Sequence, residues 1–132
     1  MTTPQDSTIA PTHPERAERP WGWHETLAEA AGHKVKRLHV HAGQRLSLQK
    51  HAQRAEHWVV VRGVARITLG NPDGETWREF DLNPGQHCDI ALGQVHRLAS
   101  VGNAPVEIIE VQFGVYLGED DITRLQDDFG RV

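Results

Sequence analysis

The sequence has few cysteines, no long apolar run and no apolar segment at its start. It has a single cysteine, Cys88, among 132 residues, which excludes a framework of intramolecular disulfides. No apolar run approaches the ~20 residues that a membrane-spanning helix needs. The opening stretch, MTTPQDSTIAPTHPERAERP, is too polar for a secretory signal peptide. We therefore expect a soluble protein of the cytoplasm.

Long runs of one charge sign are also missing. The 14 basic and 18 acidic residues leave a formal net charge of −4 and are mixed along the chain. Nucleic acids and membrane surfaces are bound by basic patches, so neither is expected as a partner. A chain of this length buries roughly two-thirds of its unfolded surface. We expect one domain, without room for a second catalytic one.

What the sequence does contain is a series of short β-type segments. Residues 1–19 hold three prolines and little apolar surface, which predicts a disordered arm before a single domain at residues 20–132. Turn formers such as NPDG and NPG separate eight segments rich in β-branched or aromatic residues. These segments are 34–40, 45–51, 57–63, 64–70, 77–82, 87–92, 96–101 and 106–113. Their spacing predicts an all-β fold, an antiparallel sandwich or barrel.

Two segments depart from the strand pattern. The stretch TLAEAAGH at 26–33 predicts a short helical or looped piece. Near the end of the chain, Ile122, Leu125 and Phe129 recur at helical spacing, which predicts one short C-terminal helix.

Four polar residues have the spacing of a metal site. Gln49 and His51 lie two positions apart and therefore share one face of an extended strand. Glu56 follows after a short bend, and His96 comes 40 positions later. Imidazole, carboxylate and amide ligands suit one divalent ion such as Zn²⁺, Mn²⁺, Fe²⁺, Ni²⁺ or Co²⁺. The alternative is a set of hydrogen-bonded polar residues inside a barrel.

The spacing around these residues resembles the two sequence motifs of the cupin superfamily. The first segment runs Gly43, five residues, Gln49-Lys50-His51, four residues, Glu56, six residues and Gly63. The second runs Gly85, five residues, Ala91-Leu92-Gly93, two residues, His96, three residues and Ser100. The chain departs from the motifs at Gln49, which replaces a common histidine, and at Ala91 and Ser100, which replace a proline and an asparagine. The resemblance implies a jelly-roll barrel, a double-stranded β-helix.

Further strings narrow the resemblance to one family. RPWGW, RAEHW, YLGEDDI and DDFGR look like the C-terminal cupin domain of type II phosphomannose isomerases, in which this domain is often joined to a mannose-1-phosphate guanylyltransferase. The similarity covers residues 20–131 and favours Zn²⁺ as the metal. Gln53 stands where these isomerases often have a further histidine. A guanylyltransferase domain is not part of this sequence.

The resemblance implies a metal-dependent isomerase that converts mannose 6-phosphate to fructose 6-phosphate through a cis-enediolate. That reaction needs a metal that stabilises negative charge, a base and a holder for the phosphate. Strand phase places Glu110 on an inward face, and we expect it to be the base. Lys36, Arg54 and Arg97 are the cations expected to hold the phosphate of this small-molecule substrate.

Two alternatives come from other classes. The chain could be a non-catalytic module that binds a sugar or sugar nucleotide, or another metal-dependent cupin enzyme such as an Fe²⁺ oxygenase. Small cupin barrels usually pair, and an open barrel leaves edge strands exposed, so we also expect a homodimer.

Overall fold

The computed structural model describes residues 15–132, and every regular element in that range is a β-strand. No helix of this range has the length and apolar character that crossing a bilayer requires. The strands are β1 (Arg16–Arg19), β2 (Gly22–Ala30), β3 (His33–Val40), β4 (Leu48–Lys50), β5 (Arg54–Arg62), β6 (Ala65–Gly70), β7 (Trp77–Leu82), β8 (His87–Ile90), β9 (His96–Ser100), β10 (Val106–Gly114) and β11 (Thr123–Gln126).

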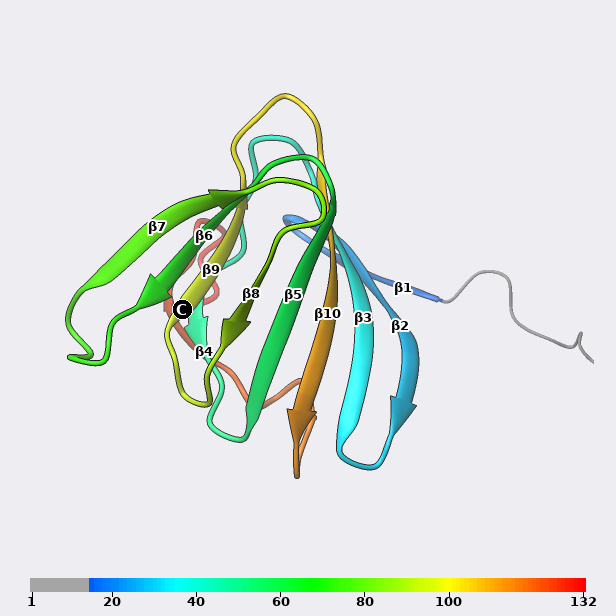
Figure 1. Cartoon of the computed structure of the whole chain (residues 1–132), viewed down its shortest axis with the longest axis vertical. Helices are drawn as coiled ribbons and strands as arrows, with labels where there is room; N and C mark the ends of the chain where they lie inside the picture. The colour runs from blue at the N-terminus through cyan, green and yellow to red at the C-terminus, as the bar shows by residue number, and fades with distance from the viewer. Residues whose placement is uncertain (1–14) are drawn as a thin grey trace, which may run out of the picture.

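The strands form two antiparallel sheets that face each other (Figure 1). Sheet A has the order β1-β2-β3-β10-β5-β8, and sheet B has the order β11-β4-β9-β6-β7. After β10 the chain crosses from sheet A to sheet B, where β11 pairs with β4 (Figure 1). The all-β sandwich expected from the spacing of the strand segments is confirmed.

The interior has an apolar half and a polar half. In sheet A, Val106 pairs with Val40, and Ile108 pairs with Leu38 and Val60; all five side chains are buried. Further along β10 the inward positions become Glu110 and Gln112, which pair with Lys36 and Lys34 of β3 and with Trp58 and Glu56 of β5. The apolar rows close one end of the sandwich, and the polar rows surround the cavity described below.

The predicted C-terminal helix is wrong. Thr123–Gln126 is strand β11, in which Thr123 pairs with Lys50 and Arg124 with Gln49. Leu125, which the helical spacing placed on an apolar stripe, is 45% exposed. A stripe of three residues is too short to outweigh the cost of starting a helix, and the open edge of β4 offers backbone hydrogen bonds instead.

The first part of the chain also differs from expectation. TLAEAAGH continues β2 as far as Ala30 and turns at Ala31-Gly32 into β3. Pairing with β3 overrides the helix preference of alanine and glutamate. Most of the predicted arm at residues 1–19 lies outside the described residues, but Arg16–Arg19 forms β1 and pairs with β2.

We expect Gly63 to tolerate an added side chain less well than Gly74 does. Its φ of +75° matches that of Gly74, but an added Cβ would lie 2.4 Å from the Pro105 carbonyl oxygen, whereas nothing lies within 4 Å of the same position at Gly74. Gly63→Ala should therefore lower the free energy of unfolding by about 1–3 kcal/mol more than Gly74→Ala. Urea denaturation of both variants measures the difference, and equal losses would contradict it.

Candidate metal centre

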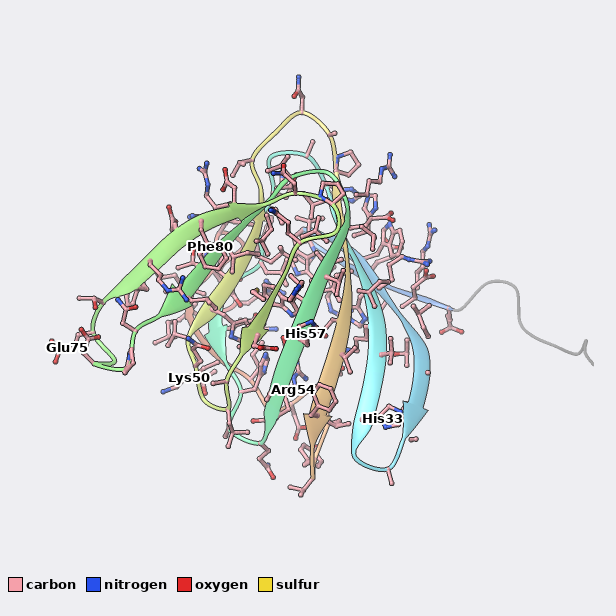
Figure 2. All side chains as sticks on the ribbon, viewed as in Figure 1. His33, Lys50, Arg54, His57, Glu75 and Phe80 are labelled. Carbon is pink, nitrogen blue, oxygen red and sulfur yellow. The ribbon has the colours of Figure 1, made fainter. Side chains whose placement is uncertain are left out.

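Three strands deliver the central polar side chains of the interior. His51 directly follows β4, Glu56 lies on β5 and His96 begins β9; their exposures are 3%, 2% and 1%. Lys50, between Gln49 and His51, is exposed and points away from the sandwich (Figure 2). Successive side chains on a strand alternate between its faces. Gln49 and His51 therefore lie on the same face, as their spacing predicted.

The three buried side chains form a compact His–Glu–His triad. One ligand atom from each lies within 4.8 Å of the other two. His51 Nε2 is 3.3 Å from Glu56 Oε2, and His96 Nε2 is 3.9 Å from Glu56 Oε1. Two imidazole nitrogens and one carboxylate at this spacing are a donor set for Zn²⁺ or another divalent first-row metal.

The hydrogen bonds made by Nδ1 in both imidazoles leave the lone pair of each ring on Nε2, the nitrogen that faces Glu56. His51 Nδ1 donates to the Asp121 carbonyl at 2.6 Å, and His96 Nδ1 donates to the Gln94 carbonyl at 2.8 Å. Each Nε2 then carries a lone pair. Burial lowers the pKa of both imidazoles to about 4, which keeps them neutral near pH 7. His96 Nε2 is buried without a hydrogen-bond partner among residues 15–132, and a metal ion is a partner that suits it.

Gln49 lies beside the triad, but its amide is not turned for ligation. It sits opposite His96 in the pairing of β4 with β9. Its Oε1 accepts from Ser47 Oγ at 2.6 Å, and its Nε2 is 3.4 Å from His51 Nε2. Ligation through the amide oxygen requires the amide to rotate by half a turn. The structure thus brings Gln49 to the triad, and its role as a ligand stays a prediction.

Arg54 lies at the start of β5 (Figure 2) and contacts two residues of the triad. Its Nε donates to Glu56 Oε2 at 2.8 Å, and its Nη2 donates to His51 Nε2 at 3.2 Å. The guanidinium compensates the charge of a carboxylate that has no access to bulk water. The sequence analysis assigned Arg54 to the phosphate of the substrate, and the structure places it as the partner of two candidate ligands.

Glu110 lies one row from Glu56 on the inner face of sheet A. Trp58 Nε1 links the two carboxylates, at 2.9 Å from Glu56 Oε1 and 3.1 Å from Glu110 Oε2. Gln112 Nε2 donates to Glu110 Oε1 at 2.7 Å. Burial, followed by the nearby charge of Glu56, raises the pKa of Glu110 to about 7. The structure therefore places the predicted base beside the triad, where it shares the Trp58 donor with Glu56.

Lys36 completes the same row of the register, because it pairs with Glu110 across β3 and β10. It is 4% exposed, and its Nζ forms an ion pair with Glu119 from the segment after β10. His24 lies in the same cavity, where burial and then the charge of Lys36 lower its pKa to about 4. Lys36, which was predicted to hold the phosphate, therefore lies at the site but is paired with the Glu119 carboxylate.

Arg97 is not brought to the site. Its neighbour His96 points inward, so Arg97 points to the opposite face of sheet B. There its Nε donates to the Leu46 carbonyl at 2.9 Å and its Nη2 to the Gln126 carbonyl at 3.2 Å. Arg97 ties β11 to the sheet, and the assignment to a substrate phosphate does not agree with this position. Strand alternation alone could have separated it from His96.

Asp121 positions the site, although it was not among the predicted site residues. Its carboxylate accepts from the backbone N–H groups of Ala52 and Gln53, both at 2.9 Å, and its carbonyl accepts from His51 Nδ1. One residue of the YLGEDDI string therefore holds both the turn after β4 and the imidazole of His51. The string was noted only as a family resemblance, and no local pattern links it to a loop 69 positions earlier.

We expect Asp121→Ala to loosen the turn that carries His51. The loss of two bonds from backbone N–H groups to a carboxylate should lower the free energy of unfolding by about 1–3 kcal/mol. Asp120→Ala is the matched control, because the Asp120 carboxylate contacts Tyr116 and not this turn. Hydrogen exchange of the Ala52 and Gln53 amides should accelerate in the first variant alone. Equal exchange in both variants would contradict the assignment.

A family model and several relatives match most of the chain. A family described as "Mannose-6-phosphate isomerase C-terminal" matches residues 5–127. The alginate biosynthesis protein AlgA of Pseudomonas aeruginosa is 48% identical over 114 residues, which are 86% of this chain and 22% of AlgA. The mannose-1-phosphate guanylyltransferase of Escherichia coli is 42% identical over 114 residues, 86% of this chain and 23% of that protein. The chain spans less than a quarter of the length of these relatives.

Solved structures share the fold at low identity. The capsular polysaccharide assembling protein CapF of Staphylococcus aureus aligns with a TM-score of 0.79 at 16% identity, over 92% of this chain and 36% of its own. The oxalate decarboxylase of Bacillus subtilis, which has Mn(II) centres, aligns with a TM-score of 0.73 at 20% identity, over 84% of this chain and 30% of its own. These cupin structures confirm the jelly-roll fold expected from the two motifs. Because the family matches from residue 5 to residue 127, the chain belongs to the family of mannose-6-phosphate isomerase C-terminal domains.

Proposed function

We propose that this domain is a metal-dependent isomerase of a sugar phosphate, and that it interconverts mannose 6-phosphate and fructose 6-phosphate. The observation that carries the proposal is the buried His–Glu–His triad with a second buried carboxylate, Glu110, beside it. His51 of the triad and Glu110 both line one cavity. The family supports the choice of substrate. AlgA and the guanylyltransferase of E. coli are far longer proteins, so the activity of this chain on its own is part of the proposal.

The chain's own residues would hold the metal and shield the reaction. His51, Glu56 and His96 would be the ligands, with Gln49 as a fourth after rotation of its amide. A bound divalent ion would polarise the two substrate oxygens and stabilise the negative charge of the cis-enediolate. The backbone carbonyls that accept from the Nδ1 atoms keep both imidazoles in the ligating tautomer.

Glu110 would carry the proton between the two carbon atoms. A carboxylate oxygen removes the proton from C2 of the open-chain aldose, and the electron pair of the broken C–H bond forms the C1–C2 double bond of the enediolate as the C1 carbonyl oxygen takes up negative charge. The same carboxyl group returns the proton to C1, while the proton of the C2 hydroxyl passes to the C1 oxygen, which leaves the ketone at C2. Trp58 and Gln112 each donate to a different oxygen of Glu110. These bonds fix the plane of the carboxyl group, so that its position does not depend on the substrate.

The metal proposal predicts that His96→Ala loses the ion. After reconstitution with Zn²⁺, wild-type protein should hold about one ion per chain and His96→Ala close to none, because a triad with one ligand missing binds weakly. His87→Ala is the control, since His87 is exposed on β8 and paired in the register with Val59, away from the cavity. Elemental analysis of the desalted proteins gives the ratio. Full metal content in His96→Ala would place the ion elsewhere.

The isomerase proposal predicts that Glu110→Gln lowers kcat for mannose 6-phosphate by about 10²–10⁴-fold with a small change in KM. Metal content should stay at the wild-type level. Glu107→Gln is the matched control, because Glu107 lies on the same strand and bonds His39 instead of the cavity residues. A coupled assay of metal-loaded protein measures both constants. Wild-type protein that binds mannose 6-phosphate without converting it would instead support a sugar-binding module.

A further inference from the structure

Strand β11 brings an arginine to the cavity that the sequence analysis did not assign to the site. Arg124 pairs with Gln49 across β11 and β4, and Gln49 pairs with His96 across β4 and β9. Side chains directly opposite each other in antiparallel strands lie on the same face. Arg124, Gln49 and His96 therefore form one row across three neighbouring strands of sheet B, and Arg124 lines the same cavity as His51 and Glu110.

The guanidinium of Arg124 has bonding capacity that the chain does not use. Its Nε is buried and has no hydrogen-bond partner in the part of the chain that the structure describes. Other cations of the cavity are engaged. Arg54 bonds Glu56, Lys36 pairs with Glu119, and Arg131 bonds Asp127 through two nitrogens. A buried donor without a partner is rare in folded proteins, and Arg124 is unlike the three paired cations in this respect.

The exposed mouth of the cavity holds one more arginine, Arg19 of β1, whose Nη1 donates to the Glu18 carbonyl. Arg19 is exposed, so its charge is screened by water. Arg124 lies deeper, in a row with Gln49 and His96. An anion that enters the cavity therefore meets an unused guanidinium on the β11 side, while His96 of the triad lies two strands away on β9.

We propose that Arg124 anchors the phosphate group of the substrate. A guanidinium binds two phosphate oxygens through parallel N–H donors. Arg124 and His96 are two strand spacings apart, or about 10 Å between backbones, and both side chains point inward. This separation suits an open-chain hexose phosphate, with its phosphate at Arg124 and its C1–C2 end at the triad. The choice of hexose rests on the proposed function, whereas the phosphate site rests on Arg124 itself.

The three residues that were expected to hold the phosphate are less suitable than Arg124. Arg97 faces away from the cavity, Arg54 compensates Glu56, and Lys36 compensates Glu119. Recruiting Arg54 or Lys36 would strip a carboxylate of its partner. Arg124 can accept an anion without breaking a hydrogen bond or ion pair among the described residues.

Calorimetric titration of the metal-loaded protein with inorganic phosphate tests the site. Wild-type protein should bind phosphate, and Arg124→Gln should weaken that binding by about tenfold or more. Arg124→Lys keeps the charge without the planar fork and should bind with intermediate affinity. Arg78→Ala is the matched control, because Arg78 is exposed on β7 over the Phe80 ring. It should bind phosphate as the wild type does. Thermal unfolding of all variants checks that they are folded.

A second arm uses mannose 6-phosphate and mannose. Arg124→Gln should raise KM for mannose 6-phosphate by about tenfold or more with a small effect on kcat, and it should leave any binding of unphosphorylated mannose unchanged. Phosphate binding that is absent in the wild type, or equal in wild type and Arg124→Gln, would overturn the assignment even if the protein is an isomerase. Phosphate binding that depends on Arg124 in a protein without isomerase activity would uphold the site and refute the proposed function.

Discussion

The interior of this domain is organised around one buried carboxylate. Glu56 is 2% exposed, and a charge without water is tolerated only where hydrogen bonds and opposite charge replace the solvent. Arg54 supplies the charge, Trp58 supplies a donor, and His51 and His96 stand on the remaining sides. Arg54 and Trp58 lie on β5 with Glu56, whereas His51 follows β4 and His96 begins β9. The two sheets must therefore come together for both imidazoles to reach the carboxylate.

The segment after β10 closes the polar end of the sandwich. It crosses from sheet A to sheet B and contributes Glu119, Asp121 and Arg124 to the surroundings of the cavity (Figure 1). Without it, Lys36 would lose its carboxylate and His51 would lose the carbonyl that fixes its tautomer. This segment thus shapes the site through hydrogen bonds and ion pairs, while the apolar core lies at the other end.

The period-two pattern of the sequence predicted the face on which a side chain lies wherever that residue belongs to a regular strand. Most strand segments and the inward faces of Glu56 and Glu110 could be predicted, because a period of two decides the face of every residue on a strand. The gathering of His51 and His96 was expected from the spacing of the two cupin-like motifs. The same rule, applied to both neighbours in β9, separates Arg97 from His96. The residues that the two cupin-like motifs place at fixed spacings, His51, Glu56 and His96, lie together in the structure.

The sequence by itself therefore determined the all-β class and the inward faces of Glu56 and Glu110, since these follow from periodicity. It brought His51, Glu56 and His96 together through the spacing of two motifs that resemble those of the cupin superfamily. Only the tertiary structure decided the C-terminal part of the chain and the partners of its residues. Leu125 and its neighbours form a strand because the edge of β4 was open, and Asp121 holds a turn 69 positions away. Such contacts depend on which distant backbone groups remain unpaired after the sheets have formed, and no local pattern records that.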